Sequence, residues 1–242
     1  MEIIPNVVHV RYKWVKFMSI ENAKKAAGYH AAELIENGMK IGIGTGTTAH
    51  YFIKKLGERC RKGLDIQAVA TSVKSERLSS IEQIPIIDIN QVTALDLCVD
   101  GADEIDPLKQ MIKGGGGAFV REKIIAKMSR EMIIIIDETK KVEKLGKCVL
   151  PIEIIPFGCL ATIEHLKNLG YFGKWRKNSD DSFFITDNHN YIFDIHFEKQ
   201  RLDPERDHAQ IIQLPGVVDT GFFFHLAGRV IMGLSDGKIR GF

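Results

Sequence analysis

The sequence lacks the features that mark secreted, membrane-spanning or nucleic-acid-binding proteins. Its four cysteines form no CxxC pair and have no histidines at metal-finger spacing, so we expect reduced thiols in a cytoplasmic protein. The formal net charge is only +2 and the basic residues are scattered among acids, which argues against nucleic-acid binding. No apolar run approaches the roughly 18 residues of a membrane span, the longest being Met132–Ile136.

The sequence also shows no sign of a signal peptide or of a nucleoside-triphosphate-binding loop. The first 17 residues mix basic side chains into a short apolar stretch without a small-residue cleavage site, so we expect no signal peptide there. Met18 is a more conventional start, and the leading segment is either an extension or the product of an upstream start codon. No GxxxxGK[ST] pattern is present, which argues against nucleoside triphosphate hydrolysis.

The chain instead has the composition of an ordinary folded protein and an alternating pattern of elements. Helical spacing of alanines predicts a first helix from Ile20 to Ile35. Strands are predicted over 39–44, 66–72, 85–89, 95–99, 111–113 and 130–140, and helices over 49–60, 73–84 and 114–129. This alternation predicts an α/β fold with a doubly wound, mainly parallel Rossmann-like sheet, which binds ligands at the carboxyl ends of its strands.

The pattern changes after Gly146. Strand, helix, strand, strand, helix and strand are predicted over 151–156, 159–170, 171–177, 183–197, 203–214 and 217–224, the split ferredoxin-like order. Two last strands, over 229–233 and 237–242, are expected to rejoin the first sheet. We therefore expect a Rossmann-like catalytic domain of residues 1–145 and 225–242, with a smaller ferredoxin-like α+β domain, residues 146–224, inserted in it.

The loop Gly44–Ala49 follows the first predicted strand and matches the dinucleotide pattern G-x-G-x-x-A. A dinucleotide also requires an acid at the end of the second strand, and that strand ends in AVATS. Amides at a helix N-terminus together with the hydroxyls of Thr45, Thr47 and Thr48 favour a phosphate on a small molecule. A tight turn with threonine caps and no ligand remains an alternative. Ser72 and Ser75 after the next strand are interpreted as helix caps.

Asp100-Gly101-Ala102-Asp103 places two carboxylates on one turn at the end of a strand. Their repulsion separates their pKa values unless a cation intervenes, and Lys113 is that cation. No metal is then required, although a magnesium site and plain helix-capping aspartates remain alternatives.

Lys113 leads into four glycines, residues 114–117, whose amides suit an oxyanion such as an enediolate. Glu122 lies about one turn into the following helix, where a carboxylate partly removed from water is a credible base for a proton next to a carbonyl.

These motifs, taken together, resemble a known family. GIGTGTTA, TSVKSE, DGADEID, KGGGGAFVREKIIA, IDETKKVEKLGK, PIEIIPF, TDNHN and LPGVVDTG occur in the order seen in ribose-5-phosphate isomerase of the A type. The resemblance covers residues 22–237 and implies interconversion of D-ribose 5-phosphate and D-ribulose 5-phosphate through an enediolate, in the non-oxidative pentose phosphate pathway, without a metal or organic cofactor.

The resemblance also implies residue roles. Glu122 corresponds to the catalytic base, Asp100 and Lys113 to residues for ring opening and proton handling, and Asp103 to a holder of substrate hydroxyls. The remaining substrate-binding positions are Gly101, Ala102, Gly114, Gly115 and Gly116 around the oxyanion, Thr45, Gly46, Thr47 and Thr48 at the phosphate, Lys140, and more weakly Lys24. A homodimer or homotetramer is implied, with no nucleic acid or membrane partner.

One departure is His189, which replaces the glycine of the family's usual TDNGN turn, so we expect a slightly rearranged hairpin. Two other functions compete with the isomerase. A CoA-transferase-like enzyme needs a CoA groove, for which the sequence gives no sign. A sugar-phosphate sensor without chemistry is disfavoured because the Asp100, Asp103, Lys113 and Glu122 set is intact.

Overall fold

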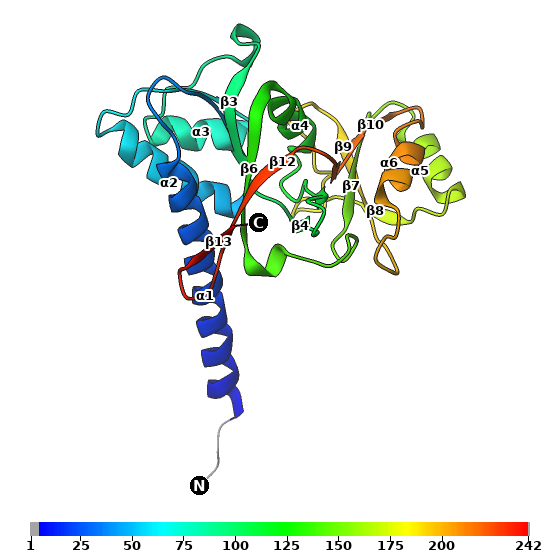
Figure 1. Ribbon diagram of the computed structural model, residues 1–242. Coiled ribbons are helices and arrows are strands. Elements are labelled where there is room, and N and C mark those ends of the chain that lie inside the picture. The colour runs from blue at the N-terminus through cyan, green and yellow to red at the C-terminus, as the bar shows by residue number, and fades with distance from the viewer. Residues whose placement is uncertain (1–4, 242) are drawn as a thin grey trace.

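The computed structural model describes the backbone of residues 5–241 and the side chains of residues 19–241. Figure 1 shows two parts side by side, a large sheet flanked by helices and a smaller part with its own sheet and two helices.

The large sheet has six strands in the order β13-β12-β6-β3-β1-β2, all parallel except β13 against β12. Its strands are β1 Lys40–Ile43, β2 Gln67–Ala70, β3 Leu95–Asp100, β6 Ser129–Asp137, β12 Ala227–Gly233 and β13 Ile239–Gly241. Its helices are α1 Pro5–Glu33, α2 Thr47–Cys60, α3 Val73–Ile81 and α4 Phe119–Met128. The predicted α/β class and mainly parallel sheet are confirmed, as is the return of the last two strands to this sheet.

The apolar run Met132–Ile136 lies in β6, in the middle of this sheet. Ile133 and Ile135 pack into the cluster that holds Phe52 of α2, whereas Ile134 and Ile136 pack into the one that holds Phe119 of α4. A parallel strand covered by helices on both faces reads as a continuous apolar run. This run therefore marks a doubly covered central strand.

The smaller part contains four antiparallel strands in the order β10-β7-β9-β8. Its elements are β7 Leu150–Ile154, α5 Cys159–Asn168, β8 Gly173–Trp175, β9 Tyr191–Ile195, α6 Pro204–Ile211 and β10 Val217–Thr220. This order has the first strand between the fourth and the third, as the split ferredoxin-like plan requires. The exact domain limits, 1–145 with 225–242 and 146–224, stay a prediction.

A third sheet, which the sequence did not predict, lies between the two parts. It comprises β4 Glu104–Ile105, β5 Met111–Ile112 and β11 Phe222–Phe223 in the order β11-β5-β4. The single strand predicted over 217–224 is broken at Gly221, whose carbonyl accepts the N–H of Lys113 at 2.9 Å and whose N–H donates to Pro151 at 2.7 Å. Lys113 is thereby fixed by backbone pairing to the chain that leaves the small sheet.

Several predicted boundaries were wrong. The helix predicted over 114–129 is α4, which begins at Phe119, so the four glycines lie outside it. Helix α1 begins at Pro5, not at Ile20. Residues 85–89 form only one bridge, Ala68 to Ile86, before the 3-10 helix η1 Ile89–Gln91, because the Asp88 side chain caps that turn. Strand β6 ends at Asp137, whose carboxylate accepts the N–H of Thr139 and starts the 3-10 helix η2 Glu138–Lys140.

The predicted strand 183–197 is likewise shorter, since residues 186–190 form a turn. The buried Glu153 carboxylate oxygen Oε1 accepts hydrogen bonds from Thr186, Asn188 and Asn190 at 3.1, 3.0 and 2.8 Å. His189 adopts φ of 63°, the left-handed conformation that a glycine takes without strain. The conformational cost of this turn therefore falls on His189, and the expected rearrangement of the hairpin stays a prediction.

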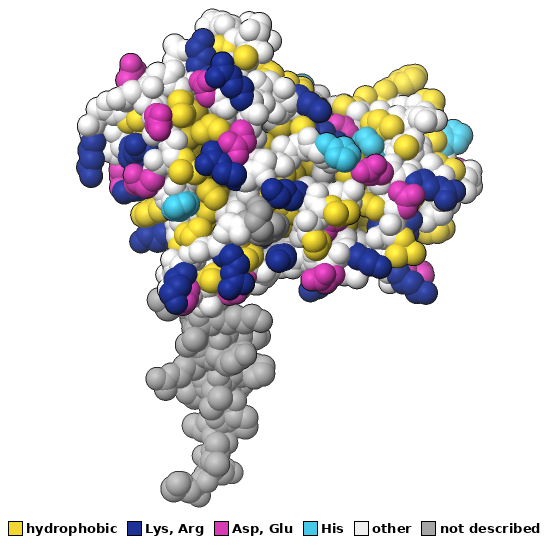
Figure 2. Space-filling model, in the orientation of Figure 1, with side chains coloured by type: hydrophobic (Ala, Val, Ile, Leu, Met, Phe, Trp, Pro, Cys, Tyr) yellow, Lys and Arg dark blue, Asp and Glu magenta, His cyan; other side chains and the backbone are white. Residues whose placement is uncertain are grey.

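Within residues 19–241, no helix is both long and apolar enough to cross a lipid bilayer. Figure 2 shows basic and acidic side chains intermixed over the visible face.

Candidate active site

The candidate site is a cleft at the carboxyl ends of β1 and β3. Thirteen residues line it: Thr45, Gly46, Thr47, Thr48, Gly101, Ala102, Asp103, Lys113, Gly114, Gly115, Gly116, Glu122 and Lys140. Parallel strands that share an edge bring the loops after β1 and β3 together, and the third sheet adds Lys113. Every predicted site residue except Asp100 and Lys24 lines this cleft.

The N-terminus of α2 forms one side of the cleft. Gly46 precedes the helix and no side chain caps it, so first-turn N–H groups have no intrahelical acceptor. Such a helix end attracts an anion through its amides and its dipole. Thr47 and Thr48 open the helix at this point.

The Thr45 hydroxyl, which was expected to bind a phosphate, contacts the hydroxyls of three neighbouring residues. Its Oγ1 lies 2.8 Å from Oγ1 of Thr71 and donates to Oγ of Ser72 at 2.7 Å, with Ser75 Oγ at 3.0 Å. Ser72 caps α3 as predicted, since its side chain accepts the N–H of Ser75. The Thr45 hydroxyl therefore joins the β1 and β2 loops.

The opposite side of the cleft holds a buried charge cluster. The Lys113 ammonium lies 3.1 Å from Asp100 Oδ2 and 3.1 Å from Glu122 Oε2, and it also donates to the Gly101 carbonyl. The two carboxylate contacts are ion pairs without hydrogen-bond geometry, because Asp100 Oδ2 and Glu122 Oε2 have no hydrogen-bond partner among the described residues. Asp100 is fully buried beneath the cleft, and its other oxygen accepts the N–H groups of Thr45 and Gly101 at 3.0 and 2.7 Å.

Burial dominates the protonation of this cluster. Removal from water raises the pKa of Glu122 to about 8, with repulsion from Asp100 adding to the shift and Lys113 opposing it. Desolvation also raises the pKa of Asp100, against the attraction of Lys113. The pKa of Lys113 is raised by its two carboxylate neighbours despite desolvation, so the lysine stays an ammonium. The base candidate thus has its pKa near neutrality, where general-base catalysis is most effective.

Glycine is required where the loops approach most closely. A Cβ on Gly44 would lie 2.1 Å from Oδ1 of Asp100, so only glycine lets the β1 loop reach that carboxylate. Gly114 has φ of 107°, and a Cβ there would lie 2.6 Å from the ring of Phe119. The next residue, Gly115, donates its N–H to Oδ2 of Asp103 at 2.8 Å.

The two predicted lysines Lys24 and Lys140 lie in different places. Lys24 does not line the cleft, and its ammonium pairs with Glu21 Oε1 at 2.8 Å on α1. Lys140 lines the cleft from η2, at the carboxyl end of β6. Among residues 19–241, no group of histidine, cysteine, aspartate and glutamate side chains is arranged to hold a metal ion.

Sequence reasoning missed Arg176, whose guanidinium donates to the Gly114 carbonyl at 2.7 Å. It follows the short strand β8 and lies in no motif, so only its contact could identify it.

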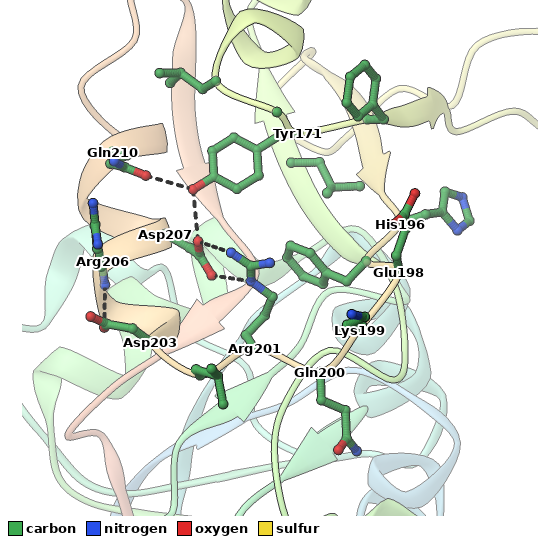
Figure 3. A pocket seen from close by; sticks show the side chains of 16 residues that line it. Tyr171, His196, Glu198, Lys199, Gln200, Arg201, Asp203, Arg206, Asp207 and Gln210 are labelled. Atoms are coloured by element: carbon green, nitrogen blue, oxygen red, sulfur yellow. Dashed lines mark hydrogen bonds and ion pairs between the residues drawn. The ribbon is translucent and has the colours of Figure 1, made fainter.

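A larger hollow, of about 770 Å³, lies in the small part and is shown in Figure 3. Arg201 and Asp207 pair with each other there: Arg201 makes two hydrogen bonds of 2.6 Å to Asp207, which also accepts the Tyr171 hydroxyl at 2.9 Å. These hydrogen bonds link α6 to the loops before β8 and before α6.

Comparison with known proteins shows the family of the chain. The family model described as Ribose 5-phosphate isomerase A (phosphoriboisomerase A) matches residues 67–237. Ribose-5-phosphate isomerase A of Protochlamydia amoebophila is 52% identical over 218 residues, which cover 90% of this chain and 94% of the relative. The chain belongs to the ribose-5-phosphate isomerase A family. Members of this family interconvert ribose 5-phosphate and ribulose 5-phosphate, and the chain is an isomerase of this kind.

Solved structures of ribose-5-phosphate isomerases have the same fold. The Plasmodium falciparum enzyme has a TM-score of 0.87 at 35% identity and covers 92% of this chain and 98% of its own. A D-ribose-5-phosphate isomerase in complex with phospho-erythronic acid also has a TM-score of 0.87, at 40% identity, with 92% and 98% covered.

Proposed function

We propose that this isomerase binds the substrate phosphate at the N-terminus of α2 and moves a proton between carbons 1 and 2 with Glu122. The observation that carries this proposal is one cleft with a buried carboxylate of raised pKa on one side and an uncapped helix N-terminus on the other. Open-chain ribose 5-phosphate has its phosphate and its aldehyde at opposite ends, which matches these two sides.

The proposed proton transfer runs in two halves. Ionised Glu122 removes the proton from carbon 2 of the aldose, a carbon–carbon double bond forms, and the aldehyde oxygen becomes an oxyanion. The proton then returns to carbon 1 while the hydroxyl proton on oxygen 2 moves to oxygen 1, which gives the ketose. Lys113 and the Gly114–Gly116 turn stabilise the charge on the enediolate.

Asp100 and Asp103 have different roles because their surroundings differ. Asp100 is buried and bonded to Lys113, so it holds the ammonium charged and supports ring opening through it. Asp103 lines the cleft, and one of its oxygens is held by the Gly115 amide, which leaves the carboxylate placed for substrate hydroxyls. Lys140 approaches the substrate from η2, and Lys24 is a weaker phosphate candidate that would have to leave Glu21.

The chemistry needs no metal or organic cofactor, because the Lys113 ammonium supplies the positive charge beside the enediolate. The test is conversion of ribose 5-phosphate by the purified chain with and without a chelator. We expect equal rates. Activity that the chelator abolishes and a divalent metal restores would refute the metal-free mechanism, and a chain with no activity would refute the function.

We further propose that the enzyme acts in the cytoplasm as a homodimer or homotetramer. Exposed apolar side chains on the small part support an interface there: Phe157, Leu160 and Leu202 are 90%, 74% and 84% exposed. Light scattering of the purified chain measures the assembly, and a monomer at micromolar concentration would contradict this proposal.

A further inference from the structure

Arg176 connects the small sheet to the glycine turn of the cleft. Its Nε and Nη2 donate to the two carboxylate oxygens of Asp194 on β9 at 2.9 and 2.5 Å. Its Nη1 donates to the carbonyls of Gly114 and Gly115 at 2.7 and 3.2 Å. The side chain is only 14% exposed and stacks over Phe184, with 5.7 Å between the guanidinium and the ring centroid. Four hydrogen bonds therefore fix the guanidinium between the sheet and the turn.

These contacts determine where the amides of the turn point. In a trans peptide the C=O and N–H groups lie on opposite sides. When Arg176 holds the carbonyls of Gly114 and Gly115, the N–H groups of Gly115 and Gly116 therefore point away from the arginine. The Gly115 N–H does so and reaches Asp103 Oδ2 at 2.8 Å. The Gly116 N–H has no acceptor within residues 19–241, and Gly116 lines the cleft.

A flexible turn needs such an external constraint. Consecutive glycines have more accessible backbone conformations than any other sequence, so their amides are not oriented by the local chain alone. An oxyanion donor contributes most when it is oriented before the charge develops. A guanidinium bonded to both carbonyls also polarises the two peptide groups and makes their N–H groups better donors.

We infer that Arg176, held by Asp194, is a positioning residue that orients the Gly115 and Gly116 amides toward the enediolate and toward Asp103. This inference rests on the proposed role of the glycine turn. It makes the small sheet a part of the catalytic apparatus, although none of its strands lines the cleft.

The test compares Arg176→Gln and Arg176→Lys with Arg201→Gln. Arg201 is a matched control, because it makes the same two-bond pair with an aspartate in the same small part (Figure 3). Its hydrogen bonds among residues 19–241 do not include one to the glycine turn. Four quantities are measured for each protein: kcat, KM, inhibition by phospho-erythronic acid and inhibition by inorganic phosphate. The acid carries a carboxylate that mimics the enediolate oxygens, whereas inorganic phosphate probes only the α2 end of the cleft.

We expect Arg176→Gln to lower kcat by about 30- to 100-fold, since loss of one oxyanion donor costs about 100- to 1,000-fold and misalignment costs less. Lysine keeps the charge without the planar fork, so Arg176→Lys should lose about tenfold. Phospho-erythronic acid should bind more weakly by a factor similar to the loss in kcat/KM. Inhibition by inorganic phosphate and all properties of Arg201→Gln should stay within twofold.

Three results would overturn the inference while leaving the isomerase function intact. They are a kcat of Arg176→Gln within twofold of the parent enzyme, equal losses in the Arg176 and Arg201 variants, or a loss of inorganic phosphate inhibition as large as that of phospho-erythronic acid. If Arg176→Gln does not fold, the same three results are sought in Arg176→Lys. An inactive parent enzyme refutes the proposed function itself.

Discussion

Replacement of Glu122 by glutamine tests the base assignment with little disturbance of the fold. The Glu122 side chain is 4% exposed and its Oε2 lies 3.1 Å from the Lys113 ammonium. With its pKa raised to about 8 by burial, Glu122 is mainly the neutral acid in the free enzyme at pH 7. Glutamine has the same shape and the same charge as that acid, so the cluster keeps its packing and its net charge.

The expected loss comes from the missing base. A positioned general base contributes about 100- to 10,000-fold to the rate, or roughly 3–5 kcal/mol of barrier. We expect kcat of Glu122→Gln to fall by that factor while KM changes less than about threefold, because the phosphate contacts are untouched. Initial rates of ribulose 5-phosphate formation measure both constants. Glu131→Gln on β6, where the side chain pairs with Arg229, is the control for the same substitution outside the cleft.

Stability provides a second measurement on the same variant. The folded-state pKa of Glu122 is raised above its unfolded value of about 4.5, so the folded protein favours the neutral acid. Its contribution to stability is complete below pH 4.5 and is lost as pH rises toward 8, by at most about 1.4 kcal/mol per pH unit. Glutamine cannot ionise, so the variant should gain stability relative to the parent between pH 5 and pH 8 in urea unfolding.

The activity measurement decides the base assignment. If Glu122→Gln keeps more than about one-tenth of the parent kcat, Glu122 is not the base.

Three further predictions follow from the same structure. Because ionised Glu122 is the base, kcat/KM should rise about tenfold per pH unit up to about pH 8 and then level off, and a flat profile between pH 6 and 8 would contradict this. Gly44→Ala should lower kcat at least about tenfold and the unfolding free energy by about 1–3 kcal/mol, because the added Cβ would lie 2.1 Å from Asp100 Oδ1. Gly241→Ala is the control, because its Cβ would lie 3.6 Å from the nearest atom, the carbonyl oxygen of Val230. His189→Gly should raise the unfolding free energy by about 0.5–1 kcal/mol because φ of 63° strains a histidine, and a loss of stability on thermal unfolding would show that the side chain contributes more than its strain costs.

Local patterns predicted most of the fold because the elements depend on short-range spacing. The apolar run of β6, the alternation of strands and helices, and the strand–helix order of the small part are all visible in the sequence. The errors occurred where a local polar contact ended an element, as at Asp88 and Asp137, or where a long-range backbone bond divided one, as at Gly221. Those contacts involve single residues and leave no periodic signal.

The sequence by itself determined that the loops Gly44–Ala49 and Asp100–Asp103 meet, because they directly follow two parallel strands that end at a common edge of the sheet. It could not determine the state of those residues. The raised pKa of Glu122 depends on enclosure by the folded protein, and Lys113 receives its place from a sheet whose strands are far apart in the chain. Arg176 reaches Gly114 across 62 residues, so its contact with the glycine turn exists only in the tertiary structure. Chain order thus brought the two loops together, whereas burial and long-range contacts decided the charges of the site and the direction of its amides.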